Sequence, residues 1–228
     1  MNLIVYLYAI VLIAVKGIQG LKSSKFLRGN INVEKVCAGN YRVFTRVGVP
    51  SATKCVNVCS ETIECDAIFF SAVNGSCTGC RKLTDLSSAL VAAAANVYYQ
   101  LVNANFSEWQ YGTSRYFFDV SKKMNYSDAK VYCQLFDAHV VVPDSQDEQN
   151  FLNARLSNTP TGVSWAHIGI INLTVVEHSG KTVNYTYWDQ EQGEPTKTEN
   201  QKCTTFWRGR KWHDGYCSNV QDVVCEHD

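Results

Sequence analysis

One segment in the last third of the chain gathers side chains that can bind a cation or a polar ligand. The segment GEPTKTENQKCTTFWRGRKWHDGYC, residues 193–217, contains three carboxylates, one histidine, two tryptophans and two cysteines. Calcium takes about six to eight oxygen ligands from carboxylates, carbonyls and water. A histidine nitrogen suits zinc or copper better than a hard cation. The segment therefore predicts a binding site, and the rest of the sequence indicates which kind.

The composition is that of a folded protein without a dominant charge. The chain has 228 residues, of which 46% are hydrophobic and 18% charged, and its formal net charge is zero. This length has room for one large or two small domains. No basic excess is present to hold a phosphate backbone, so the composition excludes nucleic acid as the expected partner.

The N-terminal residues differ from the remainder. Residues 3–15, LIVYLYAIVLIAV, form an unbroken apolar run. A membrane-spanning helix needs about 20 such residues, so the run fits the apolar region of a secretory signal peptide better. We expect residues 1–20 to be a signal peptide cleaved near Gly20, with a signal anchor as the alternative. The mature protein is then secreted and extracellular, with no membrane insertion after cleavage.

Cysteines and glycosylation sequons agree with secretion. Ten cysteines in an oxidising compartment predict disulfides. Asn-x-Ser/Thr sequons, the acceptors of N-linked glycans, are also numerous. The candidate N-glycosylation sites are Asn74, Asn105, Asn125, Asn172 and Asn184.

The cysteine spacing divides the chain into two halves. No cysteine lies between Cys80 and Cys133, and the groups on either side are even in number. Spacing alone leaves the pairings within each group open. Cys77-x-x-Cys80 also fits a redox or zinc motif, but structural disulfides are favoured in a secreted chain. We place a linker at residues 103–108, which are polar and include a sequon.

The first half predicts one helix on an antiparallel sheet. Ser51 is a candidate N-cap, and residues 65–73 and 95–102 have the aromatic and β-branched content of strands. Asn74-Gly75 marks a turn between them. The run KCVNVCSETIECDAIFFSAVNGSC resembles a PAN/apple domain over residues 30–102. That resemblance implies the disulfides Cys55–Cys77 and Cys59–Cys65, which leaves Cys37–Cys80, and it implies a domain that binds proteins or glycans.

The second half predicts two helices followed by strands. Ser127 is a candidate cap for a helix with Ala129, Tyr132, Cys133 and Phe136 on one face. The segment SQDE at residues 145–148 fits a capping box for a second helix, with Phe151, Leu152 and Leu156 facing inward. Four later segments are strand-like, namely SWAHIGI, VNYTYW, CTTFW and KWHDGYC, and residues 208–210 look like a hairpin turn between the last two.

This order resembles the C-type lectin-like domain over residues 109–228. The matching motifs are YFFDVSKKMNYSDAKVYCQLFDAHVVVPDSQDEQNFL, HIGI, YWDQEQGEP, KWHDGYC and the final VVCE. The resemblance implies the disulfides Cys133–Cys225 and Cys203–Cys217. With the first half it predicts an α+β protein of two disulfide-bonded domains, a combination that looks like secreted invertebrate defence lectins.

The resemblance also implies a calcium and sugar site. Sugar-binding members use E-P-N, a second acid and then W-N-D, whereas this chain has E-P-T and W-H-D. Each missing asparagine removes a carbonyl oxygen and an amide donor. We expect weak calcium binding or a loop that keeps its shape without metal. The candidate calcium and sugar residues are Glu194, Thr196, Glu199, His213 and Asp214, with Glu194, Glu199 and Asp214 as the calcium carboxylates.

Residues near this motif offer sugar contacts that need no metal. The accessory candidates are Trp207, Arg208, Arg210 and Lys211, which suit a sugar face or a sulfated or sialylated glycan. The alternative is an inward Trp207 and a solvated hairpin tip. We expect Trp212 and Trp188 in the core, Trp165 in core or edge packing, and His139 in core packing.

The sequence predicts a binding protein and not an enzyme. It has no G-x-S-x-G, no H-E-x-x-H and no phosphate-binding loop. A zinc hydrolase built on Glu194, His213 and Asp214 is a weaker hypothesis. The leading interpretation is a glycan-binding lectin of microbial or cell surfaces, with a role in innate immunity and a possible protein partner for the apple-like half. The alternative is a calcium-independent module that binds a receptor, a matrix or a toxin target.

Overall fold

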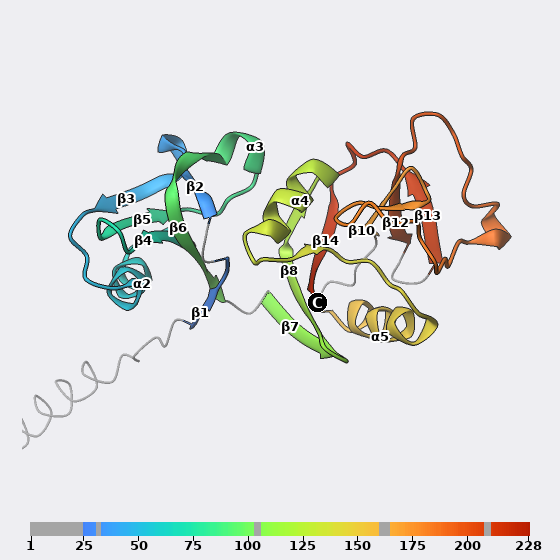
Figure 1. Ribbon diagram of the computed structural model, residues 1–228, viewed down its shortest axis with the longest axis horizontal. Coiled ribbons are helices and arrows are strands. Elements are labelled where there is room, and N and C mark those ends of the chain that lie inside the picture. The colour runs from blue at the N-terminus through green and yellow to red at the C-terminus, as the bar shows by residue number, and fades with distance from the viewer. Residues whose placement is uncertain (1–24, 31–32, 103–105, 160–164, 208–210) are drawn as a thin grey trace, which may run out of the picture.

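The chain folds into two antiparallel-rich sheets with helices packed on them (Figure 1). The computed structural model describes residues 25–30, 33–102, 106–159, 165–207 and 211–228. The predicted signal peptide, Asn105, Arg208 and Arg210 lie outside these ranges. Among the helices described, none has both the length and the apolar character that a membrane span requires.

The first sheet is antiparallel and is centred on one long strand. Its described strands are β1 (Lys25–Arg28), β2 (Val33–Cys37), β3 (Arg42–Arg46), β4 (Ala67–Ser71), β5 (Ser76–Cys80) and β6 (Leu90–Val102). Their order is β1-β6-β4-β5-β3, and β2 also pairs with β6. A short η1 (Gly39–Tyr41) and α3 (Leu86–Ala89) connect these strands. Strand β6 therefore pairs with β1, β2 and β4, and β4 continues the sheet to β5 and β3.

Helix α2 (Ala52–Glu61) packs on this sheet as predicted. The side chain of Ser51 accepts a hydrogen bond from the Lys54 N–H at 3.3 Å, so Ser51 is the N-cap. Cys55 and Cys59, four residues apart, are the buried residues of the helix and both form disulfides. One helix on an antiparallel sheet agrees with the expected architecture, and membership of the PAN/apple family stays a prediction.

Two details of the first half differ from the prediction. The Asn74-Gly75 turn, with Gly75 at φ +63°, connects β4 to β5 and not directly to the last strand. Strand β5 is short and rich in Ser, Cys and Gly, so it lacks the β-branched signal that marks its neighbours. Strand β1 begins at Lys25, before the predicted domain start at residue 30, because it pairs with the end of β6.

The second sheet carries the remaining strands. They are β7 (Phe106–Tyr111), β8 (Ser114–Met124), β9 (His139–Val140), β10 (Trp165–Ile171), β11 (Val175–Val176), β12 (Cys203–Trp207), β13 (Lys211–Gly215) and β14 (Gln221–His227). The order is β13-β12-β10-β14-β8-β7, with only β10 and β14 parallel among the described pairs. The predicted strand VNYTYW is wrong, because residues 183–188 make only an isolated bridge at Trp188. Residues 106–108 of the predicted linker belong to β7.

Two helices lie beside this sheet. The side chain of Asn125, and not that of Ser127, caps α4 (Tyr126–Gln134) by accepting from the Asp128 N–H at 3.0 Å. The predicted inward face of Ala129, Tyr132 and Cys133 is buried. Ser145 caps α5 (Gln146–Ser157) as predicted. The carboxylate of Glu148 does not close the capping box, because it accepts from the Asp144 N–H and the Tyr116 hydroxyl.

Five disulfides hold these elements. The structure pairs Cys37–Cys80, Cys55–Cys77, Cys59–Cys65, Cys133–Cys225 and Cys203–Cys217. These are the pairs that the two resemblances implied. No free cysteine is present among the described residues.

A shared core joins the two halves. Tyr98 of β6 meets Phe136 edge to face at 5.6 Å between ring centroids. The Gln100 Oε1 atom accepts the hydroxyls of Tyr98 at 2.9 Å and Tyr132 at 3.3 Å, and Gln100 Nε2 donates to Asp119 at 3.3 Å. All these side chains are buried. The two halves therefore share a packed interface and are not connected by the linker alone.

Glu148 and Glu226 form a buried carboxyl pair beside α5. Glu148 Oε1 accepts the Tyr116 hydroxyl at 2.6 Å, and Glu226 Oε2 accepts the Val142 N–H at 3.0 Å. Burial, and then the charge of Glu226, raises the pKa of Glu148 from 4.5 to about 8. Burial likewise raises the pKa of Glu226 to about 7. At neutral pH the pair therefore favours at least one bound proton.

We predict that Gln100→Ala destabilises the protein by about 3 kcal/mol, because two buried tyrosine hydroxyls and a carboxylate lose their partner. Chemical unfolding with the disulfides intact measures the change. Gln110→Ala in the exposed part of β7 is the matched control and should stay within about 0.5 kcal/mol of wild type. Equal effects of the two substitutions would contradict the prediction.

We also predict that wild-type stability falls as pH rises from about 5 to 8. The folded-state pKa of Glu148 lies above its unfolded value, so its contribution is complete below pH 4.5 and is lost as pH approaches 8. The slope can reach about 1.4 kcal/mol per pH unit. Glu148→Gln should flatten this dependence in unfolding experiments. Asp147→Asn, an exposed neighbour in the same helix turn, should leave the slope unchanged.

Candidate functional site

The hairpin of β12 and β13 positions the predicted site. Its register places Thr205 opposite His213 and Thr204 opposite Asp214. The Cys203–Cys217 disulfide joins the ends of the hairpin. Trp212 is fully buried, and its indole N–H donates to Gln149 of α5 at 2.7 Å. This anchor confirms Trp212 as a core residue, and the next side chain, that of His213, lies on the opposite face of the strand.

The loop before β12 supplies the facing residues. It contains only the short η2 (Gln190–Gln192), and its Glu194-Pro195 peptide bond is cis. Backbone bonds fix its course: the Asp189 N–H donates to Trp212 O at 3.1 Å and the Glu194 N–H to Asp189 O at 3.0 Å. The loop is therefore tied to β13 just where the predicted ligands lie.

Donors of the protein occupy both central carboxylates. Asp214 Oδ2 accepts the Lys197 N–H at 2.7 Å, and the Thr196 hydroxyl lies 3.0 Å from Asp214 Oδ1. The Asp214 N–H in turn donates to Glu194 Oε2 at 3.2 Å. Burial and Asp214 raise the pKa of Glu194. Burial opposes ionisation of Asp214, but bonds from Glu194, Lys197 and Thr196 lower its pKa.

His213 connects two carboxylates. Its Nδ1 lies 3.1 Å from Glu194 Oε1, and its Nε2 lies 3.4 Å from Asp189 Oδ2. Lys211 Nζ also lies 3.4 Å from Asp189 and 3.2 Å from Glu191. Burial opposes ionisation of Asp189, but the bonds and charges of Lys211 and His213 outweigh it and lower its pKa. His213 thus lies between Asp189 and Glu194, and each of these carboxylates also has another partner within the chain.

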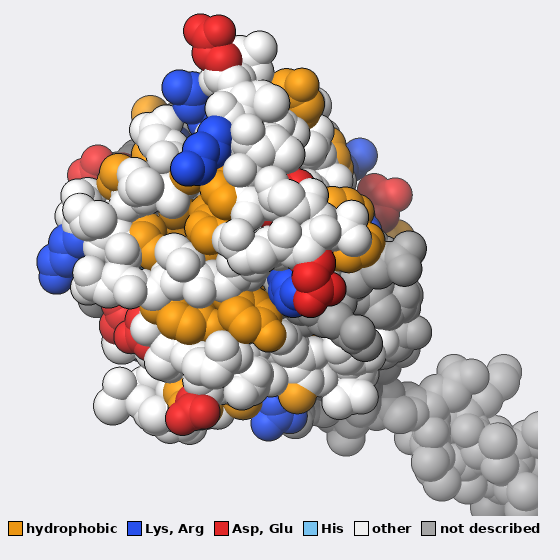
Figure 2. All heavy atoms as spheres, turned by 90° about the vertical axis from the view of Figure 1, so that its right-hand side faces the viewer, with side chains coloured by type: hydrophobic (Ala, Val, Ile, Leu, Met, Phe, Trp, Pro, Cys, Tyr) orange, Lys and Arg blue, Asp and Glu red, His pale blue; other side chains and the backbone are white. Residues whose placement is uncertain are grey.

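Two cavities flank this network. One of about 510 Å³ is lined by Trp165, Glu194, Gln201, His213, Asp214 and neighbours. The other, of about 730 Å³, is lined by Tyr187, Asp189, Trp207, Lys211 and neighbours. Trp165 is 38% exposed and meets His213 edge to face at 5.7 Å. Figure 2 faces this end of the molecule and shows hydrophobic groups set among interspersed acidic and basic side chains of the described residues.

The predicted calcium carboxylates do not form a calcium site in this arrangement. Glu199 is exposed and does not line the cavity of Glu194 and Asp214. Among the described residues, these three carboxylates are not a group whose ligand atoms lie within 4.8 Å of one another. Calcium needs about six to eight oxygens, whereas Glu194 and Asp214 already accept bonds from the chain. The residues present therefore do not fit the ion as they stand.

Several site residues differ from the sequence interpretation. Trp165, predicted as packing, lines the cavity of the carboxylates, and Trp207 lines the other cavity. Lys211 is a described accessory residue, and its charge is shared with Asp189 and Glu191. Sequence reasoning missed Asp189 and Gln201. Gln201 Oε1 lies 2.8 Å from the hydroxyl oxygen of Thr196, a contact with no sequence signal beyond proximity.

The predicted glycosylation sites have different surroundings. Asn74, Asn172 and Asn184 are exposed. Asn125 is half-buried, since its side chain caps α4 and also donates to Asp128 Oδ2 at 3.0 Å. Glycan attachment is thus sterically easiest at the three exposed asparagines, and occupancy at each stays a prediction.

Comparison with known proteins agrees with this architecture. Residues 122–227 match the family model of the lectin C-type domain. Residues 122–227 form a C-type lectin domain. The matched range falls within the predicted residues 109–228.

Curated relatives of this domain include a lectin and a glycoprotein receptor by name. Hepatic lectin of Gallus gallus is 29% identical over 131 residues, which cover 54% of this chain and 59% of that protein. Asialoglycoprotein receptor 1 of Mus musculus is 32% identical over 130 residues, covering 51% and 42%. The chain spans about half the length of the curated relatives it matches. A solved carbohydrate-recognition domain of mouse scavenger receptor C-type lectin aligns over 56% of this chain and 96% of its own, with 20% identity and a TM-score of 0.46.

We predict that roughly 10 mM calcium leaves the melting temperature of the C-type lectin domain unchanged in the full chain. A native-state ligand at 100 times its Kd would add about 2.7 kcal/mol, which is several degrees. Differential scanning calorimetry with calcium and then with chelator measures the shift. The double variant Thr196→Asn/His213→Asn supplies the two amide oxygens of E-P-N and W-N-D. It is the positive control, in which calcium should raise the melting temperature. A calcium shift in wild type that disappears in Glu194→Gln would contradict the prediction.

Proposed function

We propose that this protein is a secreted lectin whose C-type lectin domain binds glycans without calcium at the Glu194–Asp214 loop. The membership of residues 122–227 in the lectin C-type family supports glycan recognition. The names of the curated relatives support it as well. Secretion rests on the apolar N-terminal run together with the disulfides and the sequons.

The observation that carries the proposal is the cavity where Trp165 stands beside Glu194 and Asp214. A carboxylate offers about four lone-pair positions, and the bonds from His213, Lys197 and Thr196 leave part of this capacity open. Two or three sugar hydroxyls can donate to the remaining positions, and such charge-assisted bonds are strong. A sugar needs far fewer acceptor oxygens from the protein than calcium needs ligand oxygens. The same site therefore suits the sugar and not the ion.

Trp165 supplies the second half of the recognition. An indole that is 38% exposed beside polar acceptors can stack on the apolar face of a sugar ring. The cavity volume of about 510 Å³ lies within the range of ligand sites, about 300–1,000 Å³.

The charge of the cavity indicates the glycan class. Its lining includes two carboxylates, and the nearby Lys211 is already paired with two acids on the other side of His213. Like charges facing each other across an interface are unfavourable. We therefore propose neutral glycans as ligands, in preference to the sulfated or sialylated ones that the basic residues at 208, 210 and 211 suggested from sequence.

A glycan array with the full chain, in calcium and in chelator, tests the proposal. We expect binding to neutral glycans that chelator does not abolish. Trp165→Ala should weaken the affinity about tenfold, equal to about 1.4 kcal/mol. Tyr111→Ala is the matched control, because Tyr111 has 37% exposure and lies outside the cavity. Binding that depends on calcium, or that Trp165→Ala leaves intact, would contradict the proposed site.

A protein-binding module is the second candidate, and the first half supplies its observation. Val47 is 79% exposed and Val73 is 91% exposed. Their loops are joined by a hydrogen bond from the Val49 N–H to Gly75 O at 2.9 Å, so the two valines lie on adjoining loops. Retention on a protein partner, lost in Val47→Ser/Val73→Ser and insensitive to Trp165→Ala, would favour this candidate.

A further inference from the structure

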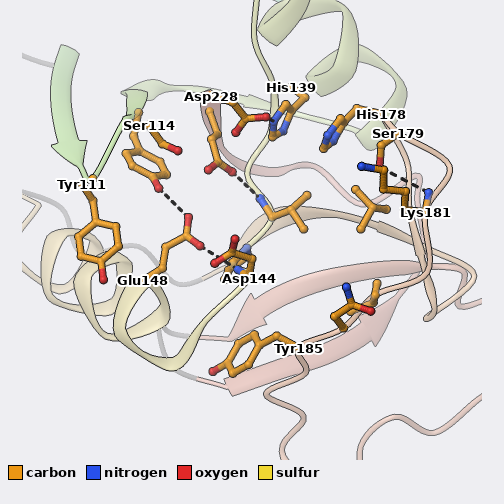
Figure 3. Close-up of a pocket in the computed structure, with 18 of the residues that line it drawn as sticks. Tyr111, Ser114, His139, Asp144, Glu148, His178, Ser179, Lys181, Tyr185 and Asp228 are labelled. Atoms are coloured by element: carbon orange, nitrogen blue, oxygen red, sulfur yellow. Dashed lines mark hydrogen bonds and ion pairs between the residues drawn. The ribbon is translucent and has the colours of Figure 1, made fainter.

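A group of side chains of the kinds that bind metal ions lies in the C-type lectin domain, away from the loop before β12 that contains Glu194 (the carboxylate loop). His139 of β9, His178 after β11 and Asp228 after β14 have ligand atoms that all lie within 4.8 Å of one another. Figure 3 shows the three side chains side by side along one rim of a cavity of about 400 Å³. From sequence, His139 was expected in core packing, but its side chain is 16% exposed at this rim.

The hydrogen bonds of His139 fix which nitrogen is free to bind. Its Nδ1 lies 3.0 Å from the carbonyl oxygen of Val140. A carbonyl only accepts, so the proton of the neutral ring is on Nδ1. The lone pair of Nε2 then faces Asp228 Oδ2 at 3.4 Å. Two acceptors this close are unfavourable unless a positive charge, a proton or a metal ion, is shared between them.

The second histidine lies flat against the first. The rings of His139 and His178 stack at 3.7 Å between centroids with an interplanar angle of 11°. Neutral imidazoles are the form that binds metal ions.

The surroundings match a zinc site. Zinc-binding histidines usually donate their other ring N–H to a carbonyl or carboxylate, as Nδ1 of His139 does to Val140. Two imidazoles and one carboxylate are a common set of three protein ligands, with a fourth position left to water or ligand. The cavity beside the three side chains leaves room for that position.

Part of the ligand spacing already matches zinc. Tetrahedral zinc with bonds of about 2.0–2.1 Å requires ligand atoms about 3.3 Å apart, and His139 Nε2 and Asp228 Oδ2 stand at 3.4 Å. His178 is exposed, and its ring has to turn out of the stack with His139 before its nitrogen faces the same ion.

We propose that His139, His178 and Asp228 bind one Zn²⁺ ion with an open coordination position that faces the cavity. This site is separate from the glycan cavity of Trp165, Glu194 and Asp214, which contains none of the three residues. The proposal therefore stands or falls independently of the proposed glycan binding.

Isothermal titration of the full, disulfide-bonded chain with zinc chloride tests the site. We expect one Zn²⁺ per chain and no heat from calcium or magnesium chloride. His178→Ala changes an exposed residue and should weaken the zinc Kd at least tenfold, as should His139→Ala. Melting temperatures in chelator show that each variant is folded, and in His178→Ala only the zinc-induced rise should be lost.

Two histidine variants serve as controls. His227→Ala changes the residue next to Asp228. The Nε2 atom of His227 lies 3.9 Å from Asp137 Oδ2, and His227 is not one of the three proposed ligands. His213→Ala changes the histidine between Glu194 and Asp189. Both should keep the wild-type zinc affinity. Absence of zinc binding in wild type, or its loss in His213→Ala but not in His178→Ala, would overturn the proposal.

Discussion

The buried amide of Gln100 is the polar contact on which the joint between the two halves depends. It accepts from tyrosines of both halves and donates to Asp119, and all of these side chains are buried. Lys122, 3% exposed and 3.3 Å from Asp66, adds a charged contact across the same joint. Because this joint covers the α4 side, the β12–β13 hairpin and its loop lie at the far end of the molecule (Figure 1). The first half therefore does not cover the loop of Glu194 and Asp214.

The carboxylate loop shows how such a site can keep its shape through its own donors. The Lys197 N–H and the Thr196 hydroxyl take the positions around Asp214 that an ion would otherwise need, and His213 does so at Glu194. A hydrogen-bonded carboxylate still accepts further hydroxyl donors, but it contributes too few free oxygens for a hard cation. The two departures from E-P-N and W-N-D therefore act together. Thr196 lies within hydrogen-bond distance of Asp214, and His213 lies between Glu194 and Asp189.

The two histidine sites of the domain illustrate how surroundings set chemistry. His213 has an acid at each nitrogen, at 3.1 Å and 3.4 Å, so it acts as a bridge that ties the loop to β13. His139 has a backbone carbonyl at one nitrogen and leaves the other facing Asp228 and a second imidazole. The first arrangement places a carboxylate oxygen at each nitrogen, whereas the second leaves the Nε2 lone pair of His139 facing Asp228. Only the second resembles a metal site.

The sequence by itself determined the caps at Ser51 and Ser145, because these follow from local capping chemistry. Its resemblance to the C-type lectin-like domain implied the α+β class, and Trp212 was expected in the core, where it lies. The sequence misplaced the cap of α4 at Ser127, since Asn125 and Ser127 are both good caps and only the backbone path decides between them. The tertiary structure alone decided that Trp165 joins Glu194 and Asp214, that Glu199 stays apart, and that His139 meets His178. These contacts join residues far apart in the chain, and no local signal encodes which side chains a folded loop brings together.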